Sequence, residues 1–325
     1  MSHSEVTMTT PVWAWHTTTL RTPEQDAPGW WVGAPSITYH SRFGFLLAYR
    51  LRAGDGRRGF AIRLAQSDDG LRFQDVWQTN QQEWSTPSFE RPCIRPAVDG
   101  DGLDLWISSV DPETDRWRVD RLTAPDPQAF GSARPIRELT AEMTGLGSVK
   151  DPFVWRQDNH RYCYVSCTPA FPETPAVLQA ITHSHDPFTV NTLLSMTGLF
   201  HSHAGGPWQW RGMVLQPRPG TFDGHTARLT SILRMRPYPW VFYDANHDQG
   251  ANYDEYAELA VLKAPDRIER PLTREPFLRQ LSSDLIRYVD AVTVGSRLHC
   301  YYEHKNPSGS HDLKVAMLDT GGSST

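Results

Sequence analysis

A short apolar segment, a polar turn and a second segment rich in aromatic and aliphatic residues recur five times along the chain. The copies are GAPSITYHSRFGFLLAYRL from residue 33, ERPCIRPAVDGDGLDLWISS from 90, KDPFVWRQDNHRYCYVSC from 150, ARLTSILRMRPYPWVFYDA from 227 and IRYVDAVTVGSRLHCYYEH from 286. Short runs of β-branched and aromatic residues bounded by turn residues are typical of β-strands. Each copy therefore predicts an antiparallel pair of strands.

A third apolar segment follows each pair. These segments are GFAIRLAQSDDG, RWRVDRLTAPDP, AVLQAITHSHDP, AELAVLKAPDR and HDLKVAML. A fourth strand fits after the third in the first unit, as FQDVWQT, and in the third unit, as FTVNTLL. We expect the piece from about 195 to 222 to be an insertion between units.

Four-stranded units repeated every 50 to 80 residues are typical of a β-propeller. Five units predict an all-β, five-bladed β-propeller with four-stranded blades. The last unit ends after its third strand, so we expect the N-terminal segment VWAWHTTTLR, residues 12–21, to complete blade five. This predicts a single domain over residues 11–320, with flexible tails at 1–10 and 321–325.

Composition fits one large all-β domain. The 325 residues include 12 Trp, 11 Tyr and 13 Phe, and aromatic residues favour strands. A net charge of −5 argues against a nucleic-acid partner. Neither a secretory signal nor an apolar run of membrane-spanning length is visible. We expect four reduced cysteines, a cytoplasmic location and no membrane partner.

One end of the predicted channel collects polar residues, because first strands start there, second strands end there and third strands start there. The first-strand starts are Ala34, Arg91, Asp151, Arg228 and Arg287, with Glu90 and Lys150 one residue earlier. The second-strand ends are Arg50, Ser109, Asp244, Glu303 and His304, and the third-strand starts are Arg58, Glu255 and His311. A purely structural hub would carry small or apolar residues, so this pattern predicts a binding pocket.

The Asp-Pro that opens the third unit, followed by an apolar strand, a turn and a Tyr-bearing strand, resembles the five-bladed glycosidase superfamily. That group includes glycoside hydrolase families 43, 62, 32 and 68 and the phosphorolytic family 130. The turn Ser-x-Asp-Gly-x-x-Phe at 67–73 is also similar to turns of family 130. The resemblance implies three carboxylates: a base on blade one, a stabilising Asp at the Asp-Pro, and a Glu acid. Asp151 matches the second, whereas Ala34 stands at the base position, and His225 and Arg228 stand where blade four opens.

Glycoside cleavage needs a protonated carboxyl group and a second carboxylate. The candidate catalytic residues are Asp151, Glu90, Glu303 and Asp244. The candidate substrate-binding residues are Arg91, Lys150, His225, Arg228, Arg287, Tyr288, Asp290 and His304. The alternative is that these acids neutralise the arginines in a structural ion-pair network.

The cations indicate an anionic partner, a uronic acid or phosphate, because guanidinium groups hold such anions through paired hydrogen bonds. The first hypothesis is a glycoside hydrolase or phosphorylase acting on a small anionic glycoside. A second is a lyase, cyclase or isomerase built on the same fold. A third is a non-catalytic carbohydrate binder that uses Trp208, Trp210 and Trp240 as stacking platforms.

Cofactors and metals are not expected. His201 and His203 resemble a metal-binding pair but lack a third ligand at convincing spacing, which favours a mobile loop over the pocket. The stretch 244–255 has the composition of a calcium loop without its spacing, and we expect a rim loop. His183 and His185 are expected to be structural residues of a turn.

Overall fold

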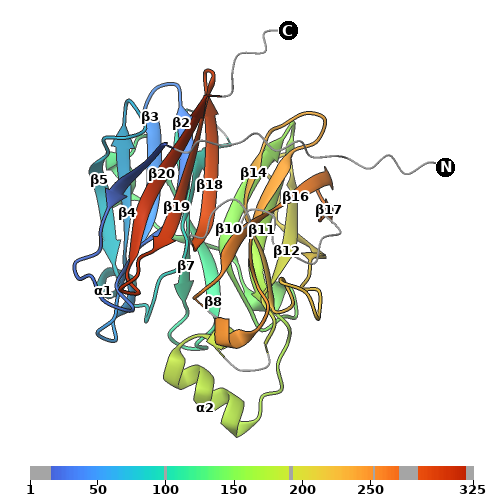
Figure 1. Cartoon of the computed structure of the whole chain (residues 1–325). Helices are drawn as coiled ribbons and strands as arrows, with labels where there is room; N and C mark the ends of the chain where they lie inside the picture. The colour runs from blue at the N-terminus through green and yellow to red at the C-terminus, as the bar shows by residue number, and fades with distance from the viewer. Residues whose placement is uncertain (1–15, 99–100, 190–192, 252, 271–284, 320–325) are drawn as a thin grey trace, which may run out of the picture.

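A computed structural model describes residues 16–98, 101–189, 193–251, 253–270 and 285–319, and the predicted tails lie outside these ranges. The fold is all β, with strands in antiparallel groups of four (Figure 1). No helix of the described residues is long and apolar enough to cross a membrane.

Each strand group follows the chain from an inner to an outer strand. The first group is β2 (Trp31–His40), β3 (Gly44–Ala53), β4 (Arg58–Ser67) and β5 (Gln74–Asn80). The second is β6 (Cys93–Pro96), β7 (Leu103–Val110), β8 (Trp117–Ala124) and β9 (Ile136–Leu139). The third is β10 (Ser148–Gln157), β11 (His160–Thr168), β12 (Met196–His203) and β13 (Gln209–Leu215). The fourth is β14 (Thr226–Leu233), β15 (Trp240–Asn246), β16 (Tyr256–Ala264) and β17 (Arg267–Glu269).

The last group is β18 (Ile286–Val294), β19 (Arg297–Lys305) and β20 (His311–Asp319), with β1 (His16–Arg21) on its outer side. β1 pairs antiparallel with β20, as the sequence predicted for this segment. A single parallel pairing, Trp31 with His311, joins this group to the first in one eight-stranded sheet. The two ends of the described chain are therefore held together by backbone hydrogen bonds.

Short helical elements connect the strands. They are α1 (Gln81–Trp84), α2 (Pro175–Ser184), η1 (Gln128–Ser132), η2 (Ala141–Met143), η3 (Pro187–Thr189) and η4 (Gln249–Ala251). Figure 1 shows α2 at one end of the molecule, beyond the strands.

The third group corrects one prediction. The segment AVLQAITHSHDP, predicted as a strand, forms α2 and the turn after it, which places His183 in the helix. Thr174 caps the helix by accepting a hydrogen bond from the Val177 N–H, and Pro175 fits the first helical position, where no N–H is needed. The prediction of a fourth strand at 188–194 is also wrong where the structure describes its beginning, because residues 188 and 189 belong to the short helical turn η3.

The true third and fourth strands of this group, β12 and β13, lie in the piece predicted as an insertion. His201 and His203 are therefore strand residues, and the mobile loop predicted for them is wrong.

The inner strands of the groups contact one another in the ring β2–β6–β10–β14–β18–β2. Four of them carry a register shift near their start, at Gly33/Ser36, Lys150/Phe153, Leu229/Ser231 and Arg287/Asp290. Three residues at these shifts have a left-handed backbone, with φ of 49° at Ala34, 53° at Asp151 and 53° at Tyr288. Left-handed backbone is strained for residues other than glycine, and such strain is concentrated at functional sites.

The hydrophobic core fills the spaces between neighbouring groups. One cluster packs Leu46 and Leu64 of the first group against Leu105 of the second, and all three are fully buried. Apolar packing therefore holds the outer parts of the groups together, whereas charged residues occupy the ends of the inner strands.

Candidate functional site

Ionisable residues gather where the inner strands begin. We call this set the mouth cluster, and each member is at most 5% exposed: Arg50, Glu90, Lys150, Asp151, Arg228, Asp244, Glu255, Arg287, Tyr288, Glu303 and His311. Burying so many charges is costly unless they are paired. The pairing pattern therefore decides which of them remain available for chemistry.

Glu303 is the most heavily paired acid of the cluster. It accepts hydrogen bonds from Arg287 Nε at 2.7 Å and from the Ala34 N–H at 3.0 Å. His311 Nδ1 lies 2.6 Å from Oε1, the oxygen that Arg287 also binds, and Arg50 lies 3.6 Å from Oε2, the oxygen that accepts from Ala34. Burial opposes ionisation, but Arg287 and His311 hold the pKa of Glu303 well below its usual range. Glu303 is thus an ionised group whose oxygens are occupied.

Glu90 and Glu255 are also paired. Glu90 binds Arg50 and lies 3.7 Å from Lys150 Nζ. Glu255 accepts from Arg228 at 2.6 Å and from Arg287. Despite burial, the two guanidiniums lower the pKa of Glu255 to about 2. For these acids, the predicted alternative of a structural ion-pair network describes the contacts well.

Asp244 differs from these glutamates. Its Oδ1 accepts the Tyr288 N–H at 3.0 Å, whereas the buried Oδ2 has no hydrogen-bond partner among the described residues. The nearest cation to Oδ2 is Arg228, at 3.8 Å. Burial raises the pKa of Asp244 to about 7, because the attraction to Arg228 only partly offsets desolvation. A carboxyl group with this pKa holds its proton over much of the neutral range.

Asp151 also keeps one buried oxygen, Oδ2, without a hydrogen-bond partner in the described ranges. Its Oδ1 accepts the Arg91 N–H at 3.2 Å, and its own N–H donates to Ser108 Oγ at 2.8 Å. Backbone contacts therefore fix this strained residue in place and leave one carboxylate oxygen uncommitted.

The Tyr288 ring lies among three guanidinium groups. Its centroid is 5.1 Å from Arg287, 5.7 Å from Arg228 and 5.9 Å from Arg50. Burial and the charge of Asp151 raise the pKa of Tyr288 above its usual value, so the phenol is protonated at neutral pH. Tyr288 thus adds a hydroxyl donor beside the arginines.

Lys150 packs over two aromatic rings. Its Nζ is 4.3 Å from the Phe188 ring centroid and 5.1 Å from that of Trp117. Burial lowers the pKa of Lys150, while Asp186 and Asp151 oppose the shift.

Several sequence candidates have other surroundings. Asp290 binds the inner strands together: it accepts from the Ile37 N–H at 3.0 Å and from Ser231 Oγ at 2.9 Å, and Arg91 lies 3.5 Å away. These contacts occupy both carboxylate oxygens of Asp290 and are those of a structural group. The substrate-binding role predicted for Asp290 and Arg91 remains an untested prediction.

The two histidine candidates lie at strand ends. His225 is half-buried just before β14, and burial together with the nearby Arg228 lowers its pKa. His304 lies near the end of β19, where Nδ1 is 3.3 Å from Asn306 Oδ1. The substrate-binding role of these two histidines stays a prediction.

Sequence reasoning missed residues around the mouth cluster. Asp186 lies just after α2 and binds Arg58 at 2.8 Å and the Trp117 indole at 2.9 Å. Arg52 lies over the Trp31 ring, 4.3 Å from its centroid, and over Tyr253 at 5.2 Å. Trp31 precedes the first repeated segment, and Tyr253 lies between the strand pair and the third segment of the fourth unit, so the repeat gave no signal for either.

Two of the three tryptophans predicted as stacking platforms pack in or against the hydrophobic core. Trp208 is buried in a core cluster and donates its indole N–H to Glu138, and Trp210 packs against the same cluster. The buried ring of Trp208 is therefore not available to stack on a sugar, and the stacking role of Trp210 and Trp240 stays a prediction.

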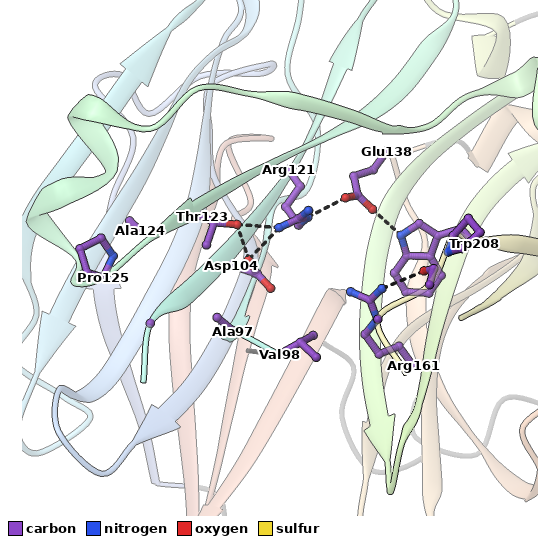
Figure 2. A pocket seen from close by; sticks show the side chains of 14 residues that line it. Ala97, Val98, Asp104, Arg121, Thr123, Ala124, Pro125, Glu138, Arg161 and Trp208 are labelled. Carbon is purple, nitrogen blue, oxygen red and sulfur yellow. Dashed lines mark hydrogen bonds and ion pairs between the residues drawn. The ribbon is translucent and has the colours of Figure 1, made fainter. Parts of the chain in front are cut away.

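A cavity of about 460 Å³ lies between the second and third groups, away from the mouth cluster. Figure 2 shows Arg121 between Asp104 and Glu138, with Trp208 and Arg161 on the other wall. Arg121 satisfies both acids, at 3.2 Å and 2.6 Å. In this inter-sheet groove, the two acids Asp104 and Glu138 are therefore already paired with Arg121.

No protein-family model and no curated protein matches the chain. Solved structures do match. A thermostable family-43 glycoside hydrolase is 13% identical, covering 91% of this chain and 92% of its own, with a TM-score of 0.62. A β-1,2-mannobiose phosphorylase from Listeria innocua is 13% identical, covering 94% and 97%, at 0.61. A glycosyl hydrolase from Bacteroides ovatus is 15% identical, covering 97% of both chains, at 0.61.

These likenesses show that the chain shares the fold of this family-43 glycoside hydrolase and this mannobiose phosphorylase, which is the fold that the sequence resemblance implied. The low identities fit a divergent sequence. At such identities the similarity concerns the fold and does not carry over the function of the matched proteins.

Proposed function

We propose that this protein is a glycosidase-like enzyme, a hydrolase or phosphorylase, that acts on a small anionic glycoside at the mouth cluster of a five-bladed propeller. The five strand groups and the ring of inner strands support the blade count. β1 on the outer side of β20 supports closure by the N-terminal strand.

One observation carries the proposal: Asp151 and Asp244 each keep a buried oxygen that has no hydrogen-bond partner among the residues the structure describes, while Glu90, Glu255 and Glu303 are committed to ion pairs. Asp244, with a pKa of about 7, suits the general acid that protonates the leaving oxygen. Asp151 suits the carboxylate that activates the nucleophile or stabilises positive charge on the sugar ring.

An anionic substrate is supported by cations that lack a close carboxylate. Lys150 comes no nearer than 3.7 Å to Glu90. Arg52 makes no ion pair within the described residues, and burial lowers its pKa to about 10. A substrate carboxylate or phosphate would relieve the repulsion between Arg52 and its neighbour Arg50.

Ala34 supports a second candidate, a non-hydrolytic step such as a lyase, cyclase or isomerase reaction. The superfamily resemblance implies a base at this position, and alanine supplies none. The same acid pair would then move protons on the substrate without transferring the sugar to water or phosphate.

The test is sugar release from a panel of aryl glycosides and aryl uronides, with and without phosphate, by the wild type and Asp151→Asn. Asparagine tolerates left-handed backbone, so this variant should keep the fold. We expect turnover to fall by ~10²- to 10⁴-fold, the usual contribution of a positioned acid or base. Asp68→Asn, at an exposed position, is the matched control. Phosphate-dependent turnover would indicate phosphorolysis, and no turnover by folded wild type on the whole panel would favour the second candidate.

A further inference from the structure

Three histidines share one face of the third strand group. His201 and His203 are two residues apart on β12, so their side chains project to the same side. His160 of β11 pairs directly with His203 in the strand register. The sequence lacked a third ligand for the His201 and His203 pair, and the antiparallel pairing of β11 with β12 supplies it.

The His160 ring lies from each of the other two rings at a distance close to that between two imidazoles on one metal ion. The His160 centroid is 5.1 Å from that of His201 and 4.6 Å from that of His203. For a tetrahedral ion with Zn–N bonds of about 2.0–2.1 Å, two ligand nitrogens lie roughly 3.3 Å apart and the ring centroids roughly 5 Å apart. His160 Nδ1 and His201 Nε2 are 2.8 Å apart and would have to separate by about half an ångström.

In the observed rotamers the cluster is a hydrogen-bonded stack, and no three metal-ligating side chains of the described chain already converge on an ion position. Arg211 lies 3.1 Å from His201 Nδ1 and donates to it. That hydrogen bond leaves the His201 proton on Nε2, which faces His160. Side-chain rotation with displacement of Arg211 would turn the nitrogens toward a common point.

We propose that His160, His201 and His203 bind a divalent transition-metal ion, with Zn²⁺ as the test ion. Neutral imidazole is a preferred ligand of Zn²⁺, and a water molecule would fill the fourth position. The site lies at the end of β11 opposite to Ser166, which pairs with Lys150 of the mouth cluster. The ion would therefore clamp β11 to β12 rather than take part in the reaction at the mouth.

The test uses isothermal titration with ZnCl₂ and thermal unfolding of the full chain with and without Zn²⁺. We expect one Zn²⁺ per chain in the wild type and a higher unfolding temperature with the ion, because a ligand that binds the folded state stabilises it. His160→Gln, His201→Gln and His203→Gln should each weaken binding at least ~10-fold, since even indirect partners of a metal contribute that much. His247→Gln, at an exposed histidine of another strand group, is the matched control.

Arg211→Gln separates a metal site from loss of packing. It removes a positive charge and a competing hydrogen bond from His201, so Zn²⁺ binding should become tighter while all three ligands remain. Absence of Zn²⁺ binding by wild type and Arg211→Gln would overturn the proposal. So would Zn²⁺ binding that is unchanged in the variant lacking all three histidines.

Discussion

The backbone N–H of Ala34 donates a 3.0 Å hydrogen bond to Oε2 of Glu303, joining the first strand of the chain's first group to the second strand of its last group. The left-handed backbone at Ala34 aims this N–H at the carboxylate. Ala34 brings no acid of its own, and the carboxylate that lies against its backbone comes from β19. The start of β2 is thus shaped to receive Glu303.

Gly33→Ala tests this relationship. A Cβ at residue 33 would overlap the Glu303 carboxylate, coming within 2.7 Å of its Cδ, and Glu303 cannot retreat without breaking its bonds to Arg287 and His311. We expect a loss of about 1–3 kcal/mol in the free energy of unfolding, the usual cost of overpacking. Gly131→Ala is the control, because a Cβ there meets nothing within 4 Å. Equal urea midpoints for the two variants would refute the close fit.

Asp290→Asn tests the structural interpretation of Asp290. Its carboxylate accepts from Ile37, Ser231 and Ala291 and faces Arg91 and Arg95. An amide has only one acceptor oxygen and no charge, so two guanidiniums lose their counter-ion. We expect a destabilisation of about 3–5 kcal/mol, measured by urea unfolding, because breaking a buried ion pair strands the remaining charge.

The control for Asp290→Asn is Asp68→Asn, which should unfold like the wild type. A stable Asp290→Asn protein that has lost substrate binding would instead favour the substrate-binding role predicted from the sequence.

The repeat of strand, turn and strand predicted most of the fold, because short runs of β-branched and aromatic residues bounded by turn residues are typical of strands. It failed at AVLQAITHSHDP, where the apolar residues fit a strand in composition but Thr174 and Pro175 provide a helix start. These two residues are a helix-start signal that the sequence itself contains, but the repeat predicted a third strand at this place.

The same repeat located the mouth cluster but not the roles of its members. Strand positions show which side chains meet, and Glu90, Glu303 and Asp244 occupy similar positions by that measure. Their difference lies in hydrogen-bond partners: the oxygens of Glu303 are occupied, whereas Oδ2 of Asp244 has no partner within the described residues. Such contacts depend on side-chain reach across groups, which one sequence does not report.

Arg52→Gln tests the anionic substrate. Glutamine keeps much of the side-chain length and loses the charge that we propose binds the anion. We expect ~10-fold or greater weakening of uronide or phosphate binding, since hydrogen bonds to charged groups contribute about 1.5–3 kcal/mol. Titration calorimetry of glucuronate and of phosphate would measure it. Arg42→Gln, at an exposed arginine, should bind both as the wild type does; identical affinities for Arg52→Gln would exclude Arg52 from the anion site.

Asp244 predicts a pH dependence of stability whose direction follows from its pKa. The folded state raises this pKa from 3.8 to about 7, so the folded protein binds the proton more tightly than the unfolded chain does. Stability from this group is fully present below pH 3.8 and is lost as pH rises toward 7. Asp244→Asn removes the titration, so its unfolding temperature relative to the wild type should rise between pH 5 and pH 8.

The same proton should also control activity. Asp244→Asn, which gains stability relative to the wild type as the pH rises, should lose activity. If Asp244 is the general acid, wild-type turnover falls above about pH 7 as the proton is lost. Asp244→Asn cannot donate that proton as an acid, so it should lose most activity at every pH, and most severely on glycosides with poor leaving groups. Thermal unfolding and turnover measured over pH 5–8 on the wild type, Asp244→Asn and the control Asp68→Asn check both effects. Parallel unfolding curves for the wild type and Asp244→Asn would show that Asp244 is ionised throughout, and would assign the acid to another group.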